Sequence, residues 1–83
     1  MLQRMKRARQ AKGSVKLWHD GEGWGVLTSA DVPDDVWASF SAIEGSGWKN
    51  LNVGEQVEFR YRPTQSKGSQ DGYSYIAESI RRL

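Results

Sequence analysis

Gly23-Trp24-Gly25-Val26-Leu27 and, further along the chain, Val36-Trp37-Ala38-Ser39-Phe40-Ser41 are the two stretches that decide the fold. Each alternates large flat side chains with small or aliphatic ones, which is typical of a strand with one face on the core. Successive strand side chains point to opposite faces of a sheet, so Trp24 and Trp37 can stand together on its outer face. An exposed row of rings is costly unless something stacks on it, and unpaired nucleic-acid bases are the commonest such ligand.

The same alternation predicts five strands, at residues 14–19, 24–29, 35–40, 55–62 and 73–80. Asp20-Gly21-Glu22-Gly23 predicts a tight turn, because glycine tolerates the positive φ that hairpin turns need. We expect a long crossover loop at 41–54, with one helical turn near 41–44, and a further loop at 63–72. The side chains expected to face the core are Val36, Ala38, Val57, Phe59, Tyr61, Ile76 and Ile80.

Five short strands with one long third connection fit an all-β fold, a small closed barrel of the oligonucleotide-binding type (OB-fold). Closure removes the open sheet edges that would otherwise invite aggregation in so small a protein. Strand content alone leaves an SH3-like barrel as an alternative.

Length and composition narrow the class of protein. The chain has 83 residues, which is one small domain, and it has no cysteine for a disulfide or a thiolate metal site. Its apolar runs are shorter than the roughly 18 residues of a membrane span, and its N-terminus lacks a secretory-signal pattern. We therefore expect a cytoplasmic protein without membrane association.

Charge is unevenly placed along the chain. Residues 1–12 hold five basic residues and no acid, whereas the remainder holds seven basic residues and all ten acids. We expect a flexible basic arm at 1–12 and a folded domain at 13–83. Such arms often contact phosphates, but a solvated leader without function is an equal alternative.

Several short motifs together resemble the bacterial cold-shock proteins. They are Gly13-Ser14-Val15-Lys16-Leu17-Trp18, then Glu22-Gly23-Trp24-Gly25-Val26-Leu27, then Val36-Trp37-Ala38-Ser39-Phe40-Ser41-Ala42-Ile43, and downstream Gly45-x-Gly47-Trp48-Lys49-x-Leu51 and Gly54-x-x-Val57-x-Phe59. The order and spacing match from about Gly13 to Phe59, and this resemblance decides for the OB-fold over the SH3-like barrel.

The resemblance implies an aromatic patch at eight positions: Leu17, Trp18, Trp24, Val26, Trp37, Ser39, Phe40 and Trp48. Leu17, Val26 and Ser39 replace a ring of the usual pattern, and Glu22 stands where the pattern has a basic residue. The patch would bind single-stranded RNA or DNA by stacking. For Trp18, a place in the core is an equally good interpretation.

Basic side chains near the patch are candidate phosphate contacts. Lys16 lies beside the patch in the sequence, and Arg60, with Arg62 and Lys67, flanks the last loop. Lys49 follows Trp48. For each of these residues, ordinary solvation is the competing interpretation.

Catalysis has little support in the sequence. His19 is the single histidine, and a phosphate loop is excluded at Gly21-x-Gly23-x-Gly25 because no Lys-Ser/Thr follows it. We expect no enzyme activity, cofactor or metal, since ligands at useful spacing are also lacking.

The resemblance also implies an RNA chaperone or regulator of gene expression, which we expect to be a monomer. The rival function is a protein-interaction module, favoured by the three lost rings, Glu22 and the acidic domain.

Overall fold

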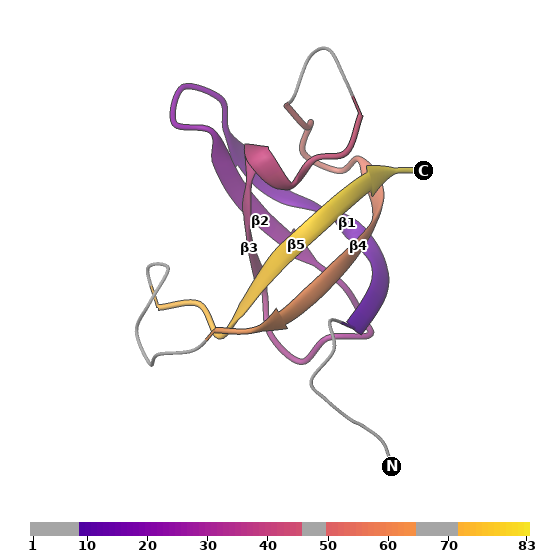
Figure 1. Cartoon of the computed structure of the whole chain (residues 1–83). Helices are drawn as coiled ribbons and strands as arrows, with labels where there is room; N and C mark the ends of the chain where they lie inside the picture. The colour runs from indigo at the N-terminus through magenta and orange to yellow at the C-terminus, as the bar shows by residue number, and fades with distance from the viewer. Residues whose placement is uncertain (1–8, 46–49, 65–71) are drawn as a thin grey trace.

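The computed structural model describes residues 9–45, 50–64 and 72–83. Within these ranges the elements are β1 (Arg9–His19), β2 (Trp24–Thr28), β3 (Val36–Ser39), the 3-10 helix η1 (Phe40–Ala42), β4 (Gln56–Pro63) and β5 (Tyr75–Arg82). The strands close into a barrel in the order β1-β2-β3-β5-β4 (Figure 1). Neighbours are antiparallel except β3 and β5, which are parallel. The predicted five-stranded OB-fold barrel is confirmed.

The first strand, β1, is longer than predicted and pairs with two neighbouring strands. Its residues from Arg9 to Ser14 pair with β4, and those from Ser14 to His19 pair with β2. The expected start at Ser14 was therefore wrong. Residues 9–12, assigned to the arm, form strand because Ala11 is buried in the core. The alternation is weak in the sequence because Ala11 is a small side chain between polar and charged residues. Residues 1–8 lie outside the described part of the chain.

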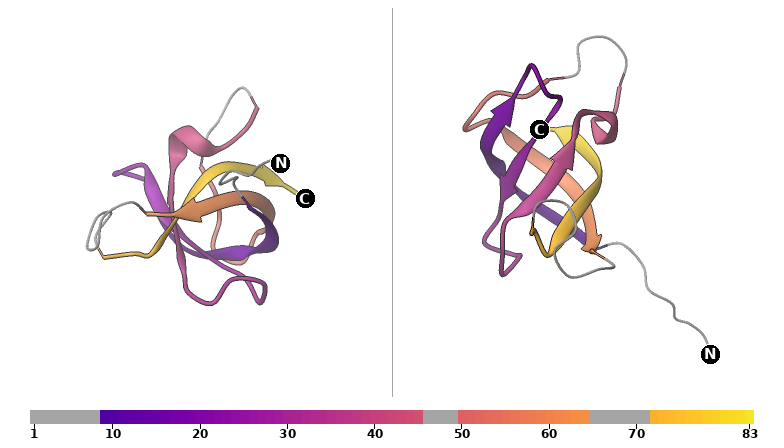
Figure 2. Two further views of the ribbon diagram at one scale, coloured as in Figure 1. Left: turned by 60° about the horizontal axis from the view of Figure 1, so that its bottom comes forward. Right: turned by 90° about the vertical axis from the view of Figure 1, so that its left-hand side faces the viewer.

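The core lies between the inward faces of all five strands. Val36, Ala38 and Val57 are fully buried, and Phe59 and Tyr61 are buried beside them, as the alternation predicted. Burying each large apolar side chain contributes about 1.5–3 kcal/mol. These buried side chains belong to one core cluster that also includes residues of the other strands. Figure 2 shows the ribbon of the barrel from two further directions.

The inward phase of β5 differs from the prediction at one position. Phe59 pairs with Ile80 and Tyr61 pairs with Ala77, so β5 contains one more residue than β4 between these two pairs. This bulge places Ala77 and Ile80 in the core, whereas Ile76 is outside the core cluster. The expectation for Ile76 was wrong because a bulge shifts every later side chain to the other face.

The remaining boundaries shift by one or two residues. β2 ends at Thr28, β3 runs from Val36 to Ser39, and Phe40 belongs to η1. The predicted helical turn is thus a single 3-10 turn, starting one residue earlier than expected. Among the residues that the structure describes, no helix is long and apolar enough to cross a membrane.

Candidate nucleic-acid interface

The outer surface of β1, β2 and β3 carries three rings in a line: His19, Trp24 and Trp37. We call them the aromatic row. The ring centroids of His19 and Trp24 lie 4.5 Å apart with the planes inclined by 43°. Those of Trp24 and Trp37 lie 6.1 Å apart with the planes only 18° from parallel. Both spacings fall within the range of interacting aromatic pairs. The row therefore forms one continuous surface across three strands.

His19 reaches this row because β1 contains a bulge, which the sequence analysis missed. Val15 pairs with Leu27, but Leu17 pairs with Val26, so Lys16 is the extra residue of β1. The bulge reverses the alternation, and Leu17 and His19 then lie on the outer face. The adjacent apolar pair Leu17-Trp18 was the signal that strict alternation fails here.

The same bulge turns Trp18 toward the core. Trp18 pairs with Gly25 in the ladder, and its half-buried ring packs against the core cluster. A Cβ at Gly25 would lie 2.3 Å from ring atom Cε3 of Trp18, so only glycine admits the indole there. The Nε1 atom of Trp18 is buried and has no hydrogen-bond partner in the described part of the chain. The core interpretation of Trp18 thus gains support, and it is not part of the aromatic row.

Aliphatic side chains form the floor beside the row. Val26 lies between Leu17 and Trp37 in adjacent ladder pairs. Its side chain is fully buried, although it does not belong to the core cluster. The large neighbours on the outer face therefore cover it, and Val26 supports the surface without offering an exposed platform of its own.

Phe40 and Ser39 extend the surface at the end of β3. Phe40 is 49% exposed, and its backbone N–H donates to the Gly23 carbonyl over 2.8 Å. Gly23 has φ of 75°, and a Cβ there would approach the Phe40 ring to 2.9 Å. Ser39 pairs with Trp24 and caps η1, its Oγ accepting from the Ser41 N–H. The hydroxyl at position 39 is thus engaged in capping.

The electrostatic surroundings of the row are acidic. The indole Nε1–H of Trp24 donates to Oε1 of Glu22 over 2.9 Å. Lys16 is 2.6 Å from Oδ2 of Asp35 in an ion pair. The hydrogen bond to Asp35, aided by its charge, raises the pKa of the Lys16 ammonium. Lys16, a candidate phosphate contact, is therefore already paired with the Asp35 carboxylate.

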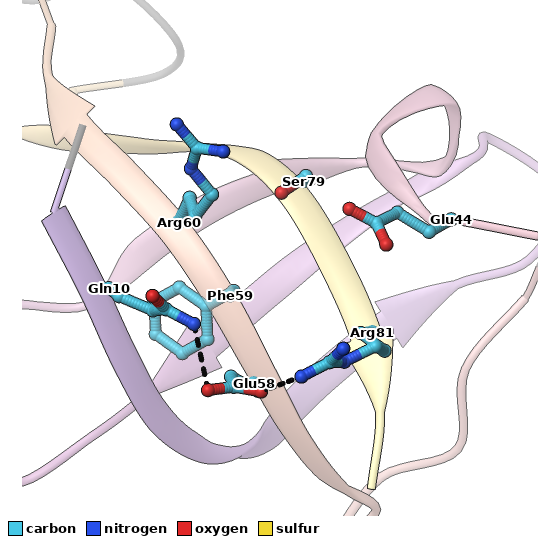
Figure 3. Close-up of a pocket in the computed structure, with 7 residues that line it drawn as sticks. All are labelled: Gln10, Glu44, Glu58, Phe59, Arg60, Ser79 and Arg81. Atoms are coloured by element: carbon cyan, nitrogen blue, oxygen red, sulfur yellow. Dashed lines mark hydrogen bonds and ion pairs between the residues drawn. The ribbon is translucent and has the colours of Figure 1, made fainter. Parts of the chain in front are cut away.

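Arg60 lies on a different surface from the row. It is exposed on β4, where its ladder partners are Gln10 of β1 and Ser79 of β5. β4 neighbours neither β2 nor β3. Arg60 lines a shallow groove of about 200 Å³ (Figure 3). The groove is lined by Gln10, Glu44, Glu58, Phe59, Arg60, Ser79 and Arg81.

Ion pairs hold much of that second surface. Glu58 accepts from Arg81 and, over 2.8 Å, from Gln10, as the dashed lines in Figure 3 mark. The hydrogen bond from Arg81 is the main reason why the pKa of Glu58 is lowered. Arg62 pairs with Glu78 at 2.5 Å, so this candidate phosphate contact is also engaged.

Three residues predicted for the site are not among those that the structure describes. Trp48, Lys49 and Lys67 lie outside the described residues. Within the described ranges, no group of three or more His, Cys, Asp or Glu side chains is arranged to hold a metal ion.

Comparisons with known proteins match the chain to one family. Residues 11–76 match the model of the "Cold-shock" DNA-binding domain. The cold shock-like protein CspC of Escherichia coli (strain K12) is 44% identical over 54 residues, covering 65% of this chain and 78% of that protein. CspC of Buchnera aphidicola subsp. Acyrthosiphon pisum (strain APS) is 41% identical with the same coverage. The cold shock-like protein CspE of that organism is 44% identical over 48 residues, covering 58% of this chain and 70% of that protein.

Proposed function

The chain belongs to the "cold-shock" DNA-binding domain family, and from that premise we propose that it binds single strands by stacking unpaired bases on the aromatic row. Nucleic-acid binding is the function that the family establishes for it. What we add is the place and the mode: the outer surface of β1, β2 and β3, with Trp24 and Trp37 as the main platforms. Phe40 would extend the surface, and Trp48 remains a predicted contributor, whereas Trp18 packs against the core.

The observation that carries this proposal is the geometry of Trp24 and Trp37. Both stand on the outer faces of adjacent strands, with ring centroids 6.1 Å apart and ring planes 18° from parallel. Each stacked base is worth about 1–3 kcal/mol by alanine substitution. Two or three platforms therefore supply useful affinity with little sequence preference, because every base offers a π-face.

The acidic surroundings shape this affinity. Asp20, Glu22 and Asp34 are exposed near the loops that border the row, and Lys16 is held by Asp35. We propose that stacking outweighs phosphate contacts on the barrel itself, and that the basic residues of 1–12 supply part of the backbone attraction. Arg60 lies on β4, so it would contact only a nucleic-acid strand that extends beyond the row and around the barrel.

An RNA-chaperone role follows from such a mode of binding. A monomer that occupies unpaired bases shifts a hairpin toward its open form without consuming ATP. We propose this role in the cytoplasm. Its measurement is the melting temperature of an RNA hairpin, which should fall as protein is added and stay unchanged with a Trp24→Ala, Trp37→Ala double variant.

Titration of tryptophan fluorescence with a short oligothymidine tests the proposed interface. Stacking should quench the emission of wild-type protein at low salt, and Trp37→Ala should weaken the binding. A fully paired duplex of similar length is the control ligand and should quench little. Absence of quenching by the single strand at low salt would reject the proposed interface.

A protein-interaction module is the second candidate. The observation in its favour is the carboxylate of Glu22 at the indole edge of Trp24, which suits a basic side chain of a partner. Failure of the single strand to bind would place this candidate first.

A further inference from the structure

Glu22 holds a defined position at the edge of the aromatic row. It lies in the turn between β1 and β2, which is fixed by bonds from the Glu22 and Gly23 N–H groups to the His19 carbonyl, at 3.0 and 2.8 Å. The Trp24 indole N–H then orients the carboxylate through Oε1. Oε2 has no hydrogen-bond partner among the residues described. The carboxylate of an exposed glutamate, a residue normally rich in rotamers, is thus held at the edge of the Trp24 indole.

Other acids near the row are engaged differently. The Asp35 carboxylate pairs with Lys16, and Asp20 accepts from the side-chain amide of Asn50 over 3.3 Å. Neither makes a hydrogen bond to a ring of the row among the described residues. Glu22 is therefore the carboxylate whose position is tied to a stacking platform.

An ionised carboxylate only accepts hydrogen bonds, so it discriminates among bases by the donors they offer. Guanine places its N1–H and N2 amino donors side by side on the Watson–Crick edge. Cytosine and adenine place a ring acceptor beside a single amino donor, and thymine or uracil flanks its N3–H with two carbonyls. A carboxylate therefore pairs with guanine through two bonds and is repelled by acceptors on the other bases.

We propose that Glu22 makes the base position on Trp24 selective for guanine. The inference rests on the proposed function, since the base must first stack on the row. The negative charge lowers general affinity for the phosphate chain, and in return two parallel bonds select one base. A good bidentate contact discriminates against the wrong base by at least about fivefold. Because Glu22 is exposed to water, the expected preference is near the lower end, about five- to tenfold.

The experiment compares strands that differ in one base. Four oligothymidines carry, at the centre, thymine, guanine, hypoxanthine or 7-deazaguanine, and tryptophan quenching gives each dissociation constant at one low salt concentration. Hypoxanthine lacks the N2 amino group, whereas 7-deazaguanine keeps the whole Watson–Crick edge. Wild-type protein should prefer guanine and 7-deazaguanine by about five- to tenfold, and hypoxanthine should lose most of that preference.

Two variants assign the preference to Glu22. Glu22→Gln should bind oligothymidine more tightly and lose the guanine preference, because an amide replaces one acceptor oxygen by a donor. Asp20→Asn removes the same charge from the same turn and should keep the preference. Equal binding of guanine and hypoxanthine strands by wild-type protein, or a preference that survives in Glu22→Gln, would overturn the inference alone. Failure of wild-type protein to bind any strand would overturn the proposed function and the inference with it.

Discussion

The outer surface of β1–β2–β3 and the outer surface of β4–β5 differ in how their polar and apolar groups are satisfied. The first exposes rings, and its sequence from Lys16 to Asp35 holds one lysine and five acids. The second holds four arginines and two glutamates within its two strands. Its ion pairs link Arg62 to Glu78 and Arg81 to Glu58. One surface is left available for a ligand, and the other is largely satisfied by its own side chains.

The rings and most of the arginine side chains of the barrel therefore lie on different surfaces. A strand stacked on the aromatic row meets carboxylates beside the rings, whereas the arginines of the barrel lie mainly on the other surface. Phosphate neutralisation by the described residues therefore contributes little at the row, and base stacking has to supply most of the affinity there. The salt dependence of binding should accordingly be shallow once residues 1–8 are removed.

Truncation of β1 should have the largest effect on stability. Removing residues 1–8 should leave the barrel folded, but removing 1–12 deletes the part of β1 that pairs with β4 from Arg9 to Lys12. The loss is about 4 kcal/mol, if each ladder hydrogen bond contributes about 1 kcal/mol. That is comparable with the whole stability of a small core, about 3–5 kcal/mol. Urea unfolding followed by circular dichroism measures both chains, and equal midpoints would contradict the role given to β1.

Ring removal should separate the two surfaces in binding. Trp24→Ala and Trp37→Ala should each weaken single-strand binding by about 1–3 kcal/mol, the value of one stacked base. Arg60→Ala, on the second surface, is the matched control and should change the slope of log affinity against log salt by at most about 0.7. Titrations at several salt concentrations give both quantities. A larger loss from Arg60→Ala than from the tryptophan variants would reverse the assignment of surfaces.

Removing the ion-pair partner of Lys16 should make the aromatic row less acidic. Asp35→Asn removes its ion-pair partner and makes the ammonium available to a phosphate. Affinity should rise by at most about fivefold, because exposed ion pairs are worth about 0–1 kcal/mol. The salt slope should steepen by about 0.7 if one new phosphate contact forms. The double variant Asp35→Asn, Lys16→Ala should lose both effects; their persistence would show that Lys16 is not the contact.

The smallest expected effect is the acid dependence of stability on the β4–β5 surface. The pKa of Glu58 is lowered in the folded protein by Arg81, so its contribution is present above the ordinary carboxyl pKa. It is lost as pH falls through the lowered folded value. Glu58→Gln should therefore reduce the drop in unfolding free energy between neutral and acidic pH. Urea titrations at both pH values measure it, and an unchanged drop would assign the acid dependence to other groups.

Alternation within strands predicted most of the fold. The inward side chains of β3 and β4 follow it without interruption, and Trp24 and Trp37 stand where it placed them. Tight turns were also readable, since Gly23 has the positive φ that the turn requires. These features depend on neighbours in the chain, which a single sequence displays directly.

Bulges and strand sharing were not predictable in the same way. The extra residue at Lys16 brought His19 into the row, and the bulge in β5 replaced Ile76 by Ala77 in the core. Each depends on the pairing register with the neighbouring strand, β2 for the first bulge and β4 for the second. The pairing of Arg9 with Tyr61 likewise depends on a residue far along the chain. Local patterning carries no record of such partners.

The division of β1 between two partners has a consequence for the order of folding. Its second half pairs with β2 across a short turn, whereas its first half pairs with β4, which lies far along the chain. Ser14 is the residue that pairs with both neighbours, with Thr28 of β2 and Gln56 of β4. Closing long loops costs entropy before their contacts form, so the row-bearing meander can assemble early and the barrel closes late. Substitutions along the β1–β4 ladder should therefore speed unfolding more than they slow folding.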